Sequence, residues 1–159
     1  MSDAVALWRV GAAPASDVVD AAADCIVADV DSPALRELAG ESLRESRFIL
    51  DPLVDQALDE LGVDRVIVAS PQRAALTAVL KRYARGELTA AAAAQWAHRY
   101  IGRNGDAACQ IFVDFDDMHD TVNYASYTVA DLDEWMAEES DAFLAGRASP
   151  GRTRVWRGI

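Results

Sequence analysis

The same signals for starting and ending a helix recur along this chain. Residues 31–40, 51–62 and 70–86 each carry a proline near their beginning and a glycine at their end. Proline is tolerated in the first helical turn, and glycine adopts the positive φ that ends many helices. Apolar residues at helical spacing mark four further segments, residues 15–30, 89–102, 106–118 and 128–145. The sequence therefore predicts a mainly α fold, a compact helical bundle of about six or seven helices.

Three stretches lack these signals for starting and ending a helix and are richer in β-branched or aromatic residues: residues 5–10, 65–70 and 152–157. They are predicted to form either a minor pair of short strands or irregular arms, because isolated strands are unstable. We expect one helical domain over residues 1–146, followed by a basic tail over residues 147–159 that contains Trp156. The tail is predicted to dock its Trp156 on the acidic segment 106–145 or on another molecule; the remaining alternative is disorder.

The charge of the chain is strongly negative and unevenly distributed. The net charge is −11, and residues 106–145 contain eleven acidic residues without one lysine or arginine. Such a protein is repelled by nucleic acid and anionic lipid and attracted to cationic surfaces. No apolar run reaches the roughly 20 residues that span a bilayer. The composition therefore predicts a cytoplasmic protein with a basic protein partner and with neither nucleic acid nor membrane as a partner.

Four aspartates lie close together in the segment 106–118 and just beyond it: Asp114, Asp116, Asp117 and Asp120. On a helix that turns by about 100° per residue, they spread over the side opposite the apolar residues. So wide a spread cannot bring four carboxylates to one cation, and Mg²⁺ or Ca²⁺ needs six or more oxygen ligands. A solvated acidic face is thus favoured over a metal site, and we expect neither a metal nor another cofactor.

Two polar residues fall within apolar helical faces. His119 lies inside the apolar sector of its helix, and Glu139 lies among Leu132, Trp135 and Phe143 on the last long helix. His119 is predicted to be satisfied by a backbone carbonyl or to titrate in a poorly solvated place. Glu139 is predicted to lie at the edge of the apolar face, or else to be buried with a partner. Because consecutive helices pack antiparallel, a direct pair between His119 and Glu139 is disfavoured.

Basic residues cluster between positions 81 and 103, where they are expected to meet either an anionic ligand or the acidic helices of the same chain. His98, in the same region, is predicted to be exposed.

Two functions remain open. The first is a small acidic interaction module, such as an inhibitor or immunity-type protein, that masks a basic partner. The alternative is a small enzyme or ligand-binding protein with an acid–base site around His119 and Glu139. The residues predicted to bind the partner in the first case are Asp114, Asp116, Asp117, Asp120, Glu134, Glu138 and Asp141.

Overall fold

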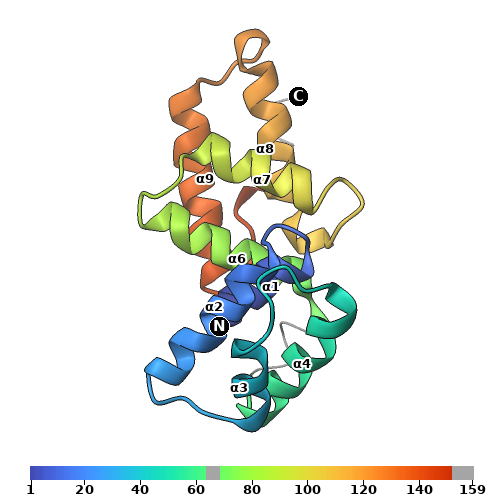
Figure 1. The fold of residues 1–159 in the computed structure, drawn as a ribbon. Coiled ribbons are helices and arrows are strands. Elements are labelled where there is room, and N and C mark those ends of the chain that lie inside the picture. Colours follow the sequence, from blue (N-terminus) through green and yellow to red (C-terminus); the bar gives the residue numbers. More distant parts are fainter. Residues whose placement is uncertain (64–68, 152–159) are drawn as a thin grey trace. The chain divides into compact units, whose positions relative to one another are not determined.

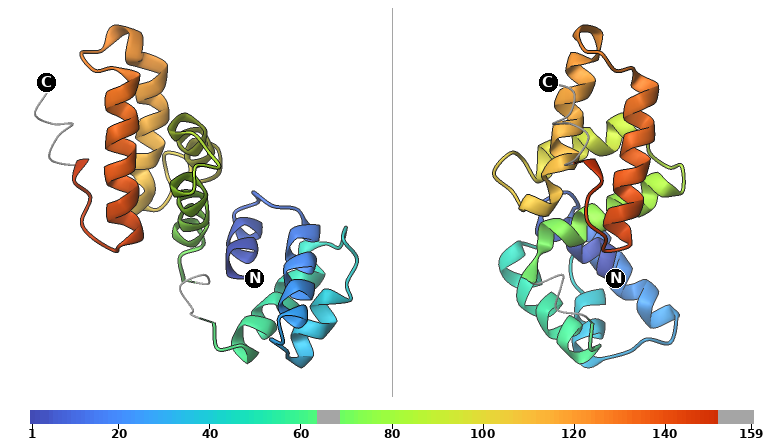
Figure 2. Two further views of the ribbon diagram at one scale, coloured as in Figure 1. Left: turned by 90° about the vertical axis from the view of Figure 1, so that its left-hand side faces the viewer. Right: turned by 180° about the vertical axis from the view of Figure 1, so that it is seen from behind.

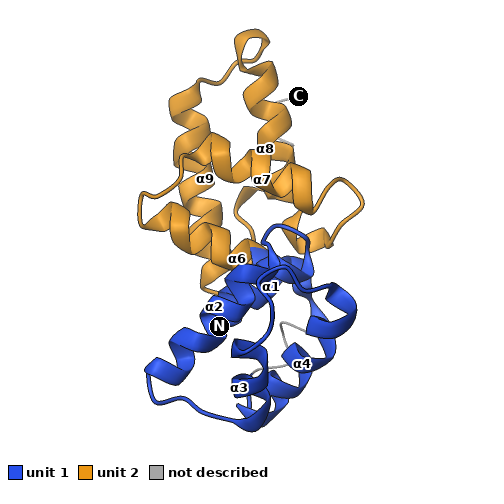
Figure 3. Cartoon of the chain, in the orientation of Figure 1, with its two compact units in different colours: residues 1–75 blue, residues 76–159 orange. Residues whose placement is uncertain are grey.

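The computed structural model describes residues 1–63 and 69–151, which fall into two compact units (Figure 3). Unit 1 comprises residues 1–75 and unit 2 residues 76–159, so the boundary lies inside a helix. The described residues contain eight α-helices and no strand, which confirms the mainly α prediction with a slightly higher helix count. A single domain over residues 1–146 stays a prediction. The expectations for residues 65–68 and for the tail from residue 152 lie outside the described residues.

Unit 1 is built from four helices that pack in chain order (Figure 1). Its core consists of aliphatic side chains and one tryptophan, among them Val5, Trp8, Val18, Leu35, Leu38, Leu50 and Val54. The helices are α1 (Ser2–Arg9), α2 (Ala15–Val27), α3 (Pro33–Ala39) and α4 (Arg47–Glu60).

Polar contacts join the first and the last of these four helices. The indole Nε1 of Trp8 donates a hydrogen bond to Asp51 Oδ1 at 2.8 Å. The guanidinium of Arg47 lies over the Trp8 ring, 4.6 Å from its centroid. These contacts tie α1 to α4 across a core that the intervening helices complete.

Three local expectations for unit 1 were wrong. Residues 5–10 were expected to be extended, but α1 runs to Arg9 because Val5 and Trp8, one turn apart, bury the same helical face. The helix expected from Asp51 begins at Arg47, which leaves Pro52 inside α4. The helix expected over residues 15–30 ends at Val27, so Val30 lies beyond α2 and is exposed.

Unit 2 contains the second part of α6 (Pro71–Ala84), α7 (Ala90–Tyr100), α8 (Gln110–Thr121) and α9 (Val129–Leu144). The short 3₁₀ helices η1 (Ala107–Cys109) and η2 (Val122–Tyr124) flank α8. In both views of Figure 2, α8 and α9 run side by side in opposite directions, and α7 lies across them. This arrangement places the acidic residues of α8 and α9 on neighbouring helices.

Small residues allow α7 to approach its neighbours closely. The buried face of α7 is made of alanine alone, and α7 packs on both α8 and α9. Phe112 of α8 is buried and meets the ring of Phe143 of α9 edge-on, with 5.4 Å between centroids. A capping box begins α9, because Thr128 and Asp131 exchange side-chain and backbone hydrogen bonds.

Candidate interaction surface

The exposed side of α9 carries four carboxylates, which we call the α9 acidic face. They come from two neighbouring rows of residues spaced four apart, so their side chains emerge on one side of the helix. Asp133, Glu134 and Asp141 are exposed and Glu138 is half-buried. Within residues 1–63 and 69–151, no lysine or arginine forms a salt bridge with Asp133, Glu134 or Asp141. The face therefore presents concentrated negative charge to solvent.

The tyrosine next to this face responds to its charge. The Tyr83 hydroxyl of α6 lies 3.5 Å from the backbone carbonyl oxygen of Asp133, to which it donates a hydrogen bond. Burial raises the pKa of Tyr83, and the negative charges of Asp133 and Asp141 raise it further. Both carboxylates therefore disfavour ionisation of the Tyr83 hydroxyl, which lies within the electrostatic field of both residues.

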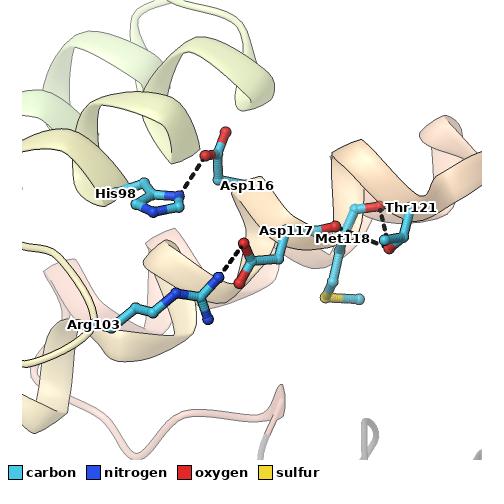
Figure 4. Close-up of polar contacts among 6 residues, drawn as sticks. All are labelled: His98, Arg103, Asp116, Asp117, Met118 and Thr121. Atoms are coloured by element: carbon cyan, nitrogen blue, oxygen red, sulfur yellow. Dashed lines mark hydrogen bonds and ion pairs between the residues drawn. The ribbon is translucent and has the colours of Figure 1, made fainter.

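The acidic side of α8 is partly neutralised within the unit (Figure 4). Asp116 Oδ2 lies 2.6 Å from His98 Nδ1, and Asp117 Oδ1 accepts a hydrogen bond from Arg103 Nη2 at 2.7 Å. The two consecutive aspartates thus reach two different basic groups, one on α7 and one just after it. Both aspartates are half-buried, unlike the exposed Asp114 and Asp120 on the same helix.

These contacts correct the expectation for His98. His98 was expected to be exposed, but it is half-buried and paired because α7 crosses α8 at this point. Asp116 and Asp117 remain predicted partner-binding residues, and their carboxylates also contact groups of their own unit. Arg103 therefore meets the chain's own acidic helix, which was one of the two possibilities for the basic cluster.

Asp114 is the carboxylate of α8 that is least favourably placed. Partial burial raises the pKa of Asp114, the charge of Asp117 raises it further, and Arg103 offsets part of the rise. A raised pKa in the folded state means that ionised Asp114 opposes folding at neutral pH. This opposition is lost as the pH falls through the folded-state pKa.

Replacement of Asp114 by asparagine is expected to stabilise the protein slightly at neutral pH. The gain should be about 0.5 kcal/mol or less, because the group is largely solvated. It should vanish below about pH 3, where the wild-type carboxyl is protonated in both states. Urea unfolding at both pH values measures the difference, with Glu134→Gln on the exposed side of α9 as a control. A gain that persists unchanged in acid would contradict this account.

Glu139 is buried rather than at the edge of the apolar face of α9, which corrects the expectation of edge placement. Its side chain is 3% exposed, and no hydrogen bond reaches its Oε1 atom within the described part of the chain. His119 is half-buried, and its Nε2 is likewise buried without a hydrogen-bond partner there. Both residues predicted for an acid–base site therefore carry an unsatisfied buried atom.

The structure nevertheless does not bring these two residues together. Ile111 of α8 and Glu139 of α9 lie against the same residue, Gly151. His119 follows Ile111 by eight residues on α8, which corresponds to about 12 Å of helix. No hydrogen bond or salt bridge between His119 and Glu139 is found, and antiparallel packing accounts for their separation.

One residue of the α9 acidic face was not predicted from the sequence. Asp133 was not among the residues predicted to bind a partner, yet it is exposed and acts together with Asp141 on Tyr83. Its spacing from Asp141, eight residues or two steps of four along α9, is the signal that identifies it.

Other site types and known proteins offer no further lead. Across residues 1–63 and 69–151, no three histidine, cysteine or acidic residues are grouped to hold a metal ion. Within the same residues, no helix has the length and apolar character needed to cross a membrane. In comparisons with known proteins, no family model, no curated protein and no solved structure matches this chain.

Proposed function

We propose that this protein is an acidic interaction module that binds and masks a basic protein partner. The observation that carries this proposal is the α9 acidic face, three of whose carboxylates are exposed on one side of one helix. Opposite charge on a partner would be attracted to this face over several ångströms and would favour one orientation of the complex.

The pairing on α8 narrows the proposed contact area. Asp117 is paired with Arg103 and so offers less net charge to a partner, and Asp116 is already in contact with His98. Segment 106–145 has no lysine or arginine of its own with which to balance α9. We therefore place the main contact on the α9 acidic face, with Asp114 and Asp120 in supporting roles.

Exposed apolar groups near the start of α9 suit a protein rather than a small ion as the partner. Val129 is 51% exposed and lies four residues before Asp133, in the same row of α9. Tyr124, in the preceding η2 segment, is 93% exposed. Tyrosine is enriched in protein interfaces, where its ring packs and its hydroxyl stays hydrated.

An inhibitor or immunity-type role is the specific form that we propose for this module. Such a protein covers the cationic site of its partner with a convex acidic surface, and it needs no catalytic group of its own. The enzyme alternative around His119 and Glu139 gains no support from the described contacts, because those residues lie at different levels of the helix pair.

The test is affinity capture of binding proteins from the native cell at low and high salt, followed by affinity measurements on the captured partner. Neutralising three carboxylates at once, by Asp133→Asn, Glu134→Gln and Asp141→Asn, is expected to weaken binding at low salt by about tenfold or more. The dependence of affinity on salt should become shallower as well, because fewer charges take part.

The matched control removes the same charge elsewhere. Asp17, Asp20 and Asp24 form an exposed row on α2, and their replacement by asparagine changes the net charge equally. This control variant should bind within about twofold of wild type, since its three residues are not part of the proposed contact on α9. Equal loss in both variants would show that net charge alone drives binding, and capture of no basic protein at low salt would refute the proposal.

A further inference from the structure

The buried carboxylate of Glu139 forms no salt bridge with a described lysine or arginine. It occupies the apolar side of α9 between Trp135 and Phe143, which are four residues before and after it. Its Oε1 atom is buried and accepts no hydrogen bond within the described part of the chain. A buried carboxylate oxygen without a donor is costly, because it has lost its hydration and gained no replacement.

The segment after α9 closes over this carboxylate. Gly146 has a φ of +65°, and Arg147 N donates to Ala142 O at 2.8 Å, so the chain turns back at the end of α9. Five residues later, Gly151 lies directly on Glu139. A Cβ atom at position 151 would overlap Oε1 and would lie 3.2 Å from Cδ of Glu139. Only glycine allows this approach, and we call residues 147–151 the closing strap.

Closure of the strap buries a second polar atom without a partner. The hydroxyl oxygen of Ser149, in the middle of the strap, is buried and has no hydrogen bond within the described residues. The closed strap thus removes water from two oxygens and provides a donor for neither. Opening of the strap would rehydrate both oxygens, which offsets part of the cost of opening at this position.

We propose that Glu139 is a receptor for a single cationic group, guarded by the closing strap. The cation it fits is a guanidinium or ammonium group, which donates hydrogen bonds to a carboxylate and binds over the face of an aromatic ring such as that of Trp135. A divalent metal fits poorly, because one carboxylate supplies too few oxygens.

The natural source of this cation is an arginine or lysine side chain of a basic protein. This assignment of the source rests on the proposed function, in which the α9 acidic face attracts such a partner. Glu139 would then anchor one of the partner's side chains, while the exposed carboxylates orient the rest of its surface.

Binding of methylguanidinium to the full chain tests the receptor without knowledge of the partner. NMR signals of the Trp135 indole N–H and the Gly151 amide should shift and saturate as methylguanidinium is added. Its neutral analogue N-methylurea should produce no saturable shift, and sodium chloride serves as the control for ionic strength. Methylguanidinium shifts that never saturate, or that N-methylurea reproduces, would overturn the proposal in the wild-type protein alone.

Two substitutions separate the carboxylate from the strap. Glu139→Gln keeps the size of the side chain, removes its charge and should abolish saturable binding. Gly151→Ala prevents the strap from closing as observed and should bind methylguanidinium more tightly, because less of the protein is closed. Unchanged affinity in Glu139→Gln would refute the receptor, and unchanged or weaker affinity in Gly151→Ala would refute the guarding role of the strap.

The methylguanidinium experiment tests the Glu139 receptor independently of the proposed function. The triple variant of Asp133, Glu134 and Asp141 should still bind methylguanidinium even if it loses the basic protein. Loss of the protein alone would concern the α9 acidic face, whereas loss of methylguanidinium binding in Glu139→Gln alone concerns the buried receptor.

Discussion

Truncation of Phe112 to alanine is expected to destabilise unit 2 by about 3–5 kcal/mol, the usual cost of removing a buried phenylalanine ring. The Phe112 side chain is 1% exposed and contacts two other rings, Phe143 at 5.4 Å and Phe115 at 6.5 Å between centroids. Its removal leaves a cavity between α8 and α9 that rigid helices fill only in part. Chemical unfolding, followed by near-ultraviolet circular dichroism, measures the loss.

The matched control is the same substitution at a phenylalanine that solvent surrounds. Phe48, at the start of α4, is 86% exposed. Phe48→Ala should change the free energy of unfolding by no more than about 0.5 kcal/mol, as for most surface substitutions. Similar losses in the two variants would contradict the placement of the core between α8 and α9.

Replacement of Glu139 by methionine is expected to stabilise the protein. Methionine has a similar length and no polar atom that needs a hydrogen bond, so the penalty at Oε1 disappears. The expected gain is about 1–3 kcal/mol, the usual cost of one unsatisfied buried group. Thermal unfolding should show a higher midpoint, whereas Glu134→Met on the exposed side of α9 should leave it nearly unchanged.

A destabilising result for Glu139→Met would mean that the carboxylate contributes to folding and that its isolation is only apparent. The expected result combines with the binding proposal: the stabilised variant should no longer bind methylguanidinium. A residue that costs stability yet supports binding is a common property of functional sites.

The helices could be predicted from the sequence because their ends are encoded locally. Three helix starts in the structure are marked by capping residues: Ser32 followed by Pro33 in α3, Thr89 in α7, and Thr128 with Asp131 in α9. Such caps depend on side chains within one helical turn and therefore need no knowledge of the rest of the fold. α1 could not be predicted in this way, because no side chain caps its first turn and only packing against α2 reveals its buried face.

The candidate site could be predicted only in part, since a helical wheel describes one helix at a time. The wheel placed Glu139 among apolar residues, and the structure buries it there. It could not show that α7 crosses α8 and gives Asp116 and Asp117 their basic partners. It also could not show that Gly151, twelve residues after Glu139, returns to cover the carboxylate.

The alanine face of α7 has a consequence for the α8 pairs. Ala90, Ala93, Ala94 and Ala97 are all buried, and a methyl group has no alternative rotamer with which to absorb a displacement. Backbone shape alone therefore sets the register of α7 against its neighbours. A slip of one helical turn, about 5.4 Å, would separate His98 from Asp116 and Arg103 from Asp117 together. The register of α7 therefore determines both side-chain contacts together, and a change of register would break both.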